Sequence, residues 1–350
     1  MMEYTVIGLM SGTSLDGVDV ACCVFSYENG RWDYKITFAE TFPYTEEWFK
    51  RLSCLPASTA AEFASADHLF GHLLGKITSG FIEKYKIKAD FIASHGHTVF
   101  HQPANGFTSQ IGNGAAIKAE TGLTVICDFR SGDVADGGQG APLVPAGDRL
   151  LFPMYDYCLN LGGFANISFD LLGDRLAFDI CPVNIVLNLL AGKEGRPCDM
   201  DGAMASTGKL NPELLNALNS LPYYSLPGPK SLGKEWVEAN ISPLLDNSGL
   251  KTEDLLSTFC THIAEQIALN TGIDNGKKLL ITGGGTHNKH LVSEILAHIR
   301  PQLIIPDLLT INFKEALIFA FLGVLRQRNE INCLKTVTGA KQNGSFGAIY

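Results

Sequence analysis

The sequence predicts an α/β protein made of two halves. Short apolar strands alternate with helical patterns along the whole chain, and a glycine-bearing hairpin near the start has a counterpart near residue 160. With 350 residues, of which 46% are hydrophobic and 18% charged, the chain is long enough for about two domains with large cores. We therefore expect two α/β domains, the second beginning near residue 150.

The first half opens on a β-hairpin. Strand-like runs at 4–9 and 18–25 flank a polar turn, and 34–41 reads as a third strand. Thr59 and Glu62 have the spacing of a capping box at the start of a long helix. One face of that helix should pack on the sheet; it carries Phe63, Phe70, Leu74, Ile77 and Phe81.

Further short strands are expected at 91–93 and 123–127. The second ends in Asp128-Phe129-Arg130, which places charged groups at the carboxyl end of a strand, where open α/β sheets bind ligands.

The second half repeats this pattern. Strands at 157–161 and 167–170 flank Gly162 and Gly163, which gives a second glycine-bearing hairpin. A strand at 279–281 then leads through Gly283-Gly284-Gly285 into a helix at 289–299. Backbone donors at such a helix start suit an anion, and the missing side chains let a base or ribose lie against the main chain. Three glycine turns that each follow an apolar strand together indicate a nucleotide site.

The first turn has the composition of a phosphate grip. Gly8, Gly12 and Gly17 allow close backbone approach, and Thr13 and Ser14 add hydroxyl donors. Asp16 and Asp19, three residues apart, can hold a hydrated Mg²⁺ against bound phosphates. The alternative interpretation of this segment alone is an ordinary glycine-rich hairpin turn.

Charge and apolar patterning exclude several classes of protein. The net charge of -9 and the absence of Lys/Arg clusters argue against nucleic acid or an anionic membrane as partner. The longest apolar run, 316–325, is shorter than the roughly 20 residues of a membrane span and fits a buried helix. No basic residue precedes the first apolar stretch, so we expect no signal peptide and a cytoplasmic location. Neither a P-loop nor a G-x-G-x-x-G fingerprint is present.

The cysteines and histidines favour no metal site. Nine scattered cysteines form no C-x-x-C pair, so most should be small buried apolar residues. His95, His97 and His101 lack a nearby Cys or carboxylate that would complete a zinc site, and we expect them in a loop after strand 91–93, bonded to a polar ligand. His68 and His72 are expected on a helix surface.

Several motifs together resemble one known family, the 1,6-anhydro-N-acetylmuramic acid kinases, over nearly the whole chain. In order, they are the run 10–19, Asp128-Phe129-Arg130 with Asp133, the run 137–145, the run 160–166, Pro229-Lys230-Ser231, Gly283-Gly284-Gly285 with Asn288, and Val337-Thr338-Gly339-Ala340. The resemblance implies the actin, hexokinase and heat-shock chaperone ATPase fold, which is ribonuclease H-like, with two duplicated α/β domains and an interdomain cleft for ATP and substrate. We place the domains at 1–148, with a C-terminal segment of about 335–350, and at 149–334.

By this resemblance, the reaction couples hydrolysis of the 1,6-anhydro bridge to transfer of the γ-phosphoryl group of ATP onto O6. The family's general base lies in an Asp-Thr-Gly-Pro-x-Asn motif that matches 179–184, which implies Asp179 as the base. Without the resemblance, Asp179 reads as a cap for a helix starting near Asn184. The implied ATP site comprises the first turn with both later glycine turns, and Asp16 and Asp19 are the implied Mg²⁺ ligands. Its residues are Gly12, Thr13, Ser14, Leu15, Asp16, Gly17, Val18, Asp19, Gly162, Gly163, Asn166, Gly283, Gly284 and Gly285.

A further set of residues is expected to bind the sugar substrate. Arg130 and His95 are expected to position the lactyl carboxylate or ring oxygens, and Asp133 and Glu315 to supply acidic partners. Glu315 alternatively serves as a helix N-terminal charge. His97 and Gln110 complete the expected set of substrate-binding residues, which comprises His95, His97, Gln110, Arg130, Asp133 and Glu315.

Five residues depart from the family or superfamily pattern. Met10 replaces the usual superfamily Asp, His97 a Gln, and Asn113 an Asp. Ile180-Cys181 replaces Thr-Gly, which we expect to fill space beside the substrate.

Two rival functions remain open on sequence alone. One is an ATP-dependent kinase of another amino sugar with a free hydroxyl, in which Asp179 would deprotonate that hydroxyl directly. The other is a non-catalytic nucleotide-dependent sugar sensor on the same fold. The expected partners are a small-molecule sugar and a second copy of the chain in a homodimer, without nucleic acid or membrane. The segments 132–142 and 227–233, rich in Gly and Pro, are the expected moving parts.

Overall fold

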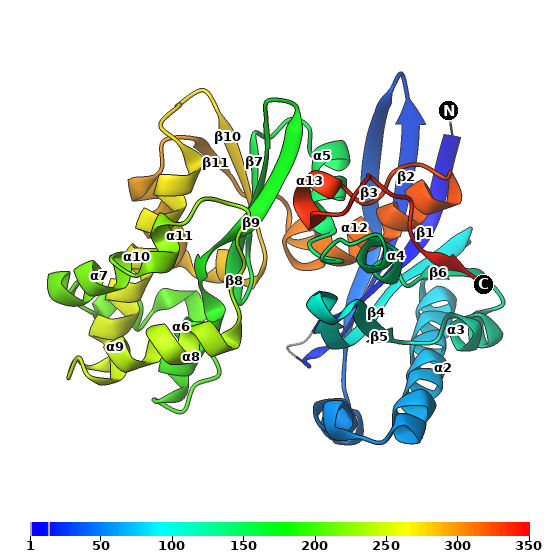
Figure 1. Ribbon diagram of the computed structural model, residues 1–350, viewed down its shortest axis with the longest axis horizontal. Helices are drawn as coiled ribbons and strands as arrows, with labels where there is room; N and C mark the ends of the chain where they lie inside the picture. Colours follow the sequence, from blue (N-terminus) through cyan, green and yellow to red (C-terminus); the bar gives the residue numbers. More distant parts are fainter. Residues whose placement is uncertain (1, 13–14) are drawn as a thin grey trace. The chain divides into compact units, whose positions relative to one another are not determined.

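The computed structural model describes residues 2–12 and 15–350. By its internal contacts the chain forms two compact units (Figure 1). Unit 1 comprises Met1–Phe152 and Phe313–Tyr350, and unit 2 comprises Pro153–Asn312. The first boundary falls four residues beyond the expected one. The second differs more, because 313–334 was expected in the second domain and belongs to unit 1.

Unit 1 contains a mixed sheet with helices on both faces. Its strands are β1 (Met2–Ser11), β2 (Gly17–Glu28), β3 (Arg31–Pro43), β4 (Phe91–Gln102), β5 (Phe107–Ile111), β6 (Thr124–Cys127) and β12 (Ala348–Ile349). Its helices are α1 (Glu46–Cys54), α2 (Ala60–Tyr85), α3 (Gly114–Thr121), α4 (Ser131–Ala135), α5 (Val144–Leu151), most of α12 (Leu308–Gln327) and α13 (Lys335–Thr338).

Unit 2 contains a smaller sheet covered by a helical layer. Its strands are β7 (Tyr157–Leu161), β8 (Phe164–Leu171), β9 (Asp174–Pro182), β10 (Lys278–Thr282) and β11 (Gln302–Ile304). Its helices are α6 (Asn184–Gly192), α7 (Pro212–Asn219), α8 (Lys234–Asn240), α9 (Ser242–Asp246), α10 (Thr252–Thr271) and α11 (Lys289–His298). The 3₁₀ turns η5 (Pro222–Ser225) and η6 (Gly284–His287) matter for the site.

The two units share one strand order. Unit 1 runs β12-β6-β4-β1-β2-β3, with β5 on β4, and unit 2 runs β11-β10-β7-β8-β9. Each unit begins with an antiparallel three-strand meander and then adds strands parallel to its first strand. This repeated topology confirms the predicted fold class of duplicated ribonuclease H-like α/β domains.

Helices cover both faces of the unit 1 sheet, as alternate residues of β1 show. Ile7 and Leu9 pack with Phe70, Leu74 and other α2 residues in one apolar cluster. On the other face a Cβ added to Gly8 would lie 2.1 Å from the carbonyl oxygen of Ala316, so the α12 backbone rests directly on β1. The predicted capping box of Thr59 and Glu62 is present at the start of α2.

Helix α12 accounts for the longest apolar run. Among the described residues it is the one helix long and apolar enough for a membrane span, but 78% of that window is buried within the structure. This burial is typical of a core helix, as expected for 316–325. Because α12 covers the β1–β4 region, its segment after the kink at Phe313 groups with unit 1.

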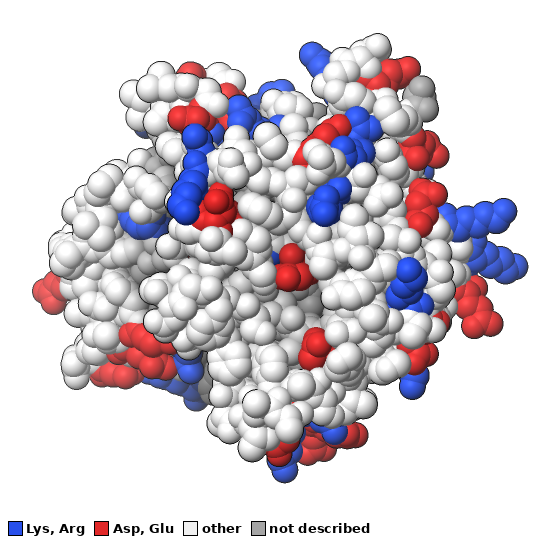
Figure 2. All heavy atoms as spheres, turned by 45° about the vertical axis from the view of Figure 1, so that its right-hand side comes forward, with Lys and Arg blue, Asp and Glu red and all other residues white. Residues whose placement is uncertain are grey.

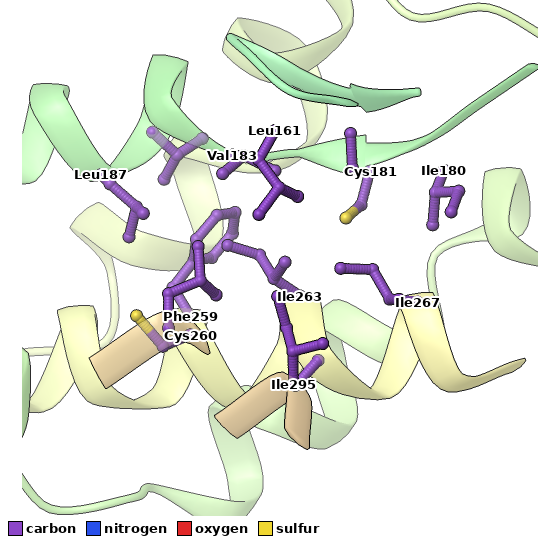
Figure 3. Close-up of a cluster of buried hydrophobic side chains, with 14 of the residues drawn as sticks. Leu161, Ile180, Cys181, Val183, Leu187, Phe259, Cys260, Ile263, Ile267 and Ile295 are labelled. Carbon is purple, nitrogen blue, oxygen red and sulfur yellow. The ribbon is translucent and has the colours of Figure 1, made fainter. Parts of the chain in front are cut away.

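The core of unit 2 lies between its sheet and α10. Phe259, Ile263 and Ile267 on α10 point toward Leu161 and Cys181 of the sheet (Figure 3). Seven of the nine cysteines are buried, including Cys181 and Cys260, and none is in a disulfide among the described residues. The prediction that most cysteines are buried apolar residues is confirmed.

Candidate functional site

The first glycine turn connects the end of β1 to the start of β2. Thr13 and Ser14 lie outside the described residues. Leu15 has a φ of 60°, an uncommon backbone conformation for a residue with a branched side chain. Its side chain packs against the apolar cluster, and Val18 is fully buried within that cluster, so neither presents its side chain to a ligand. Gly17 must be glycine, since a Cβ would lie 2.4 Å from the Phe42 carbonyl oxygen.

Asp16 and Asp19 lie near enough to interact electrostatically. Asp16 is exposed, and Asp19 on β2 accepts a hydrogen bond from the Thr41 hydroxyl at 2.5 Å. Burial raises the pKa of Asp19, and the charge of Asp16 raises it further. A divalent cation would relieve this repulsion, so the donor set fits Mg²⁺ whose other ligands are water and phosphate. No described group of three His, Cys, Asp or Glu forms a complete metal site.

The three histidines of β4 lie on the strand itself. The expectation of a loop after residue 93 is wrong, because β4 continues to Gln102 and pairs with β5. His97 is 5% exposed, and its Nδ1 lies 3.1 Å from Ser11 Oγ, which lies 2.6 Å from the Tyr44 hydroxyl. Burial lowers the pKa of His97, so the ring is neutral near pH 7. His97 thereby holds the end of β1 as well as facing the first turn.

His95, which is buried, and Arg130, which is half-buried, form a second pair. The Nε and Nη2 groups of Arg130 donate to His95 Nε2 at 3.0 and 2.9 Å, and Nη1 donates to the Gly140 carbonyl at 2.6 Å. Burial holds the pKa of His95 well below its usual range, and the charge of Arg130 lowers it further. His95 is therefore a neutral acceptor, and its Nδ1 donates to the Gly96 carbonyl at 2.8 Å. Within residues 2–12 and 15–350, these bonds use one N–H each of Nη1 and Nη2, so a second N–H on each can meet an anion.

Burial lowers the pKa of Arg130 to about 10, and the charge of Glu315 opposes that effect. Phe313 has a non-helical backbone, so α12 consists of two helical segments, and Glu315 lies in the first turn of the second, where its alternative role as a helix N-terminal charge stays open. Burial raises the pKa of Glu315, while Arg130 lowers it and Asp19 and Asp16 raise it. The structure thus brings Arg130, Glu315 and the Asp16–Asp19 pair into one electrostatic group in unit 1.

Asp133 does not belong to that group as a ligand-facing residue. Its side chain is fully buried, and its oxygens accept hydrogen bonds from Gly140 N at 2.7 Å, Thr338 Oγ1 at 2.8 Å and Cys333 Sγ at 3.0 Å. Asp133 therefore ties the glycine loop at 137–140 to the C-terminal segment, which corrects the expectation of an acidic sugar partner.

A hollow of about 220 Å³ lies beside these residues in unit 1. Of the expected sugar residues it is lined by His95 and Gln110. The Oε1 atom of Gln110 is buried with no hydrogen-bond partner among the described residues. Asn113 also lines the hollow, but it caps α3 through Ala116 N and donates to Asp67. Asp128, expected at a ligand-binding strand end, also lines the hollow. Sequence reasoning missed the hollow's Asp67 and Ser131, which lie on α2 and α4 and come together only in the folded chain.

The glycine turns of unit 2 lie side by side on neighbouring strands. Gly283 has a φ of 87°, and a Cβ there would lie 2.5 Å from Asn160 Oδ1. A Cβ on Gly285 would lie 2.8 Å from Leu161 Cβ, so both positions need glycine for packing. Gly163 has nothing within 4 Å, and Gly284 meets only Asn184 Nδ2 at 3.7 Å. Gly163 and Gly284 are therefore the positions open to a ligand.

Asp179 lies within β9 and accepts a hydrogen bond at each oxygen. Asn166 Nδ2 donates to Oδ1 at 2.8 Å, and Leu232 N donates to Oδ2 at 2.9 Å. Burial raises the pKa of Asp179, and these two hydrogen bonds oppose the rise. The capping alternative is wrong, because α6 begins after Val183 without a side-chain cap. Asn166, which was expected to bind nucleotide, is in hydrogen-bond contact with Asp179.

A β-bulge at residue 180 separates Asp179 from the core. The register pairs Asn166 with Asp179 and Ala165 with Cys181, which leaves Ile180 as the extra residue. Ile180 and Cys181 are both fully buried in the core cluster of unit 2 (Figure 3). The expectation that they fill space beside the substrate is therefore wrong, and this departure from the family pattern is a change of core packing.

Charged side chains of both signs lie on the surface. On the face drawn in Figure 2, Lys and Arg are interspersed with Asp and Glu. Two α/β units with the same strand order and with glycine turns at strand ends fit the class that the sequence predicted, phosphotransferases of the actin-like ATPase fold.

The comparisons with known proteins narrow this class to one family. Residues 4–350 match the family model for anhydro-N-acetylmuramic acid kinase. Proteins of that name from Pseudomonas syringae pv. tomato and Hydrogenovibrio crunogenus are each 36% identical to this chain, covering 100% and 98% of it and 100% and 97% of their own lengths. The corresponding protein of Pasteurella multocida is 34% identical over 100% of this chain and 98% of its own. The chain belongs to the anhydro-N-acetylmuramic acid kinase family and is an enzyme.

Proposed function

We propose that the enzyme hydrolyses the 1,6-anhydro bridge of anhydro-N-acetylmuramic acid and phosphorylates O6 with ATP. One water and one ATP are consumed, and N-acetylmuramate 6-phosphate and ADP are formed. Such a reaction serves the recycling of cell-wall peptidoglycan and the catabolism of its amino sugars. The proposal depends mainly on the surroundings of Asp179. Its carboxylate is half-buried on β9, in the sheet that carries the glycine turns of unit 2, and each of its oxygens accepts one hydrogen bond.

In this mechanism Asp179 acts as the general base. Its carboxylate removes a proton from water as the water oxygen bonds to the anomeric carbon, and the bond from that carbon to the bridging oxygen breaks. The released O6 attacks the γ-phosphorus, and ADP leaves. The raised pKa of Asp179 makes it a stronger base than an exposed Asp, and Asn166 and Leu232 hold its two oxygens in place.

Residues of unit 1 would bind the remaining charges. Arg130, held by His95 and Gly140, offers its free Nη1 and Nη2 protons as a fork for the lactyl carboxylate. Asp16 and Asp19 would hold Mg²⁺, which supplies charge neutralisation to the phosphates when bound. The exposed backbone at Gly163 and Gly284 supports nucleotide binding there. A cytoplasmic location follows from the need for ATP, and a homodimer follows from the family resemblance and is testable by light scattering.

The test is ADP release on mixing the enzyme with Mg-ATP and anhydro-N-acetylmuramic acid, with the product analysed after reaction in H₂¹⁸O. We expect solvent oxygen at the anomeric carbon and a phosphate on O6. Asp179→Asn should lower kcat by about 10³-fold. Asp174→Asn changes an exposed carboxylate on the same strand and should leave kcat unchanged.

Two outcomes would replace this proposal. Turnover only with free amino sugars, without solvent oxygen in the product, would assign the enzyme to a kinase of another sugar. Binding of nucleotide and sugar without turnover would assign a sensor role.

A further inference from the structure

Three polar side chains lie next to one another across three strands of unit 2. The register pairs Asn160 on β7 with Asn166 on β8, and Asn166 with Asp179 on β9. Asn160 Nδ2 donates to Asn166 Oδ1 at 3.3 Å, and Asn166 Nδ2 donates to Asp179 Oδ1 at 2.8 Å. We call these residues the amide ladder.

Donor chemistry sets the direction of the ladder. An ionised carboxylate can only accept hydrogen bonds, so Asn166 must turn its NH₂ group toward Asp179. Its carbonyl oxygen then faces Asn160, which must in turn present its own NH₂ group. The orientation of each amide therefore depends on the residue on the next strand.

Glycine closes the other end of the ladder. Thr282 of β10 pairs with Asn160, and the Oδ1 atom of Asn160 faces the backbone of Gly283. A Cβ at Gly283 would lie 2.5 Å from that oxygen, so any side chain there would displace Asn160. Asn160 and Asn166 thus lie between the backbone of Gly283 and Asp179.

The second oxygen of Asp179 is held from a separate segment. Leu232 N donates to Oδ2 at 2.9 Å, and Lys230 O accepts from Asp179 N at 3.0 Å. Lys230 Nζ donates to the Tyr223 and Leu226 carbonyls at 3.1 and 3.0 Å, which fixes this segment over β9. With Oδ2 fixed independently, the ladder decides what Oδ1 meets.

We propose that Asn160 is a positioning residue for Asp179. It acts through Asn166, whose amide it holds with the NH₂ group toward the carboxylate, and so sets the orientation and proton affinity of Asp179. The proposal rests on the proposed function for the role of Asp179 as general base. Asn160 itself touches neither substrate nor nucleotide in this role.

The first test is Asn160→Asp, which keeps the shape but replaces the donor by a charged acceptor; the added charge itself also raises the pKa of Asp179, so the neutral Asn160→Ala below separates the two effects. Asn166 would then donate to the new carboxylate and turn its oxygen toward Asp179, removing a hydrogen bond that favours the ionised form. We expect Asp179 to titrate about one pH unit higher. The acid limb of the pH profile of kcat/KM should move upward by the same amount, so that at pH values below this limb kcat/KM is about tenfold lower than in the unmodified enzyme.

Two further variants keep the test decisive. Asn160→Ala leaves Asn166 free to rotate, so it should shift the titration in the same direction but less. Asn240→Asp makes the same isosteric change at a residue of α8 whose amide bonds the Trp236 carbonyl, and it should leave the titration unchanged.

The titration is measured without substrate, by ¹³C NMR of aspartate carboxyl carbons, with the Asp179 signal assigned by its loss in Asp179→Asn. An unchanged Asp179 titration in the neutral Asn160→Ala variant overturns the proposal, even if the activity of that variant falls. A shifted titration together with full activity of Asp179→Asn supports the positioning role and refutes the proposed function. The two failures are therefore distinguishable.

Discussion

Substitution by alanine should strongly destabilise the protein at Gly283 but hardly change its stability at the adjacent Gly284. Gly283 has a φ of 87° and a ψ of 166°, a region that only glycine adopts readily. Forcing another residue into it costs of the order of 1–3 kcal/mol. A Cβ would also lie 2.5 Å from Asn160 Oδ1 and 2.9 Å from the Leu161 carbonyl carbon, and overlap of this kind costs about 1–3 kcal/mol.

Gly283→Ala should therefore destabilise the protein by about 4 kcal/mol. At Gly284 the nearest atom to a Cβ is Asn184 Nδ2 at 3.7 Å, an ordinary contact, so Gly284→Ala should change stability by less than about 1 kcal/mol. Urea unfolding followed by circular dichroism gives both values from the midpoints, and thermal unfolding should show a difference of roughly 10 °C.

Activity separates packing from ligand binding in the same pair. If nucleotide lies against the exposed turn, Gly284→Ala should raise the KM for ATP while the fold is unchanged. Gly163→Ala, at a position with nothing within 4 Å of a Cβ, gives a second measurement of the same kind. Equal unfolding midpoints for Gly283→Ala and Gly284→Ala would refute the reasoning from backbone geometry.

Three further predictions concern charged groups. Lys314 and Asp148 form a buried ion pair at 2.7 Å in unit 1. Lys314→Met alone should lower the free energy of unfolding by about 3–5 kcal/mol, whereas Lys314→Met combined with Asp148→Leu should restore most of that stability. Urea unfolding of both variants measures these changes, and equal losses of stability would contradict the prediction. Burial lowers the pKa of His262 to about 3, so below pH 6.5 the unfolded chain binds a proton at this residue that the folded chain does not bind. The free energy of unfolding should therefore fall by up to about 5 kcal/mol between pH 6.5 and pH 3. His262→Gln should flatten that part of the stability profile, and an unchanged slope would exclude His262 as its cause. Because burial raises the pKa of Asp179, kcat/KM should fall with decreasing pH at a higher pH than for an exposed Asp; an acid limb below pH 3.8 would contradict this.

Local signals were enough for most of the fold. Both hairpins, the capping box of α2 and the strand–glycine–helix unit at 278–298 were predicted correctly. Each depends on residues near one another in sequence, through side-chain period, cap donors or glycine turns. The repeated strand order then confirmed the duplicated α/β fold class.

Nonlocal pairing caused the errors. The continuation of β4 through its histidines depends on pairing with β5, as between His101 and Thr108, and the sequence around Gly96 has no strand signal of its own. Asp133 was expected to face a ligand, but its partners Cys333 and Thr338 come from a segment some 200 residues later.

The amino-acid sequence by itself determined the class of protein, because glycine turns, strand periods and the order of motifs are properties of short segments. The resemblance of the motif around Asp179 to that of the family also singled out this residue, which from its local sequence alone was interpreted as a helix cap. Only the tertiary structure decided how that carboxylate is held. A bulge turns Ile180 and Cys181 into the core, and the donors to Asp179 come from β8 and from a segment more than fifty residues away. Hydrogen-bond partners of this kind depend on strand register and loop packing, which are set by contacts between distant parts of the chain.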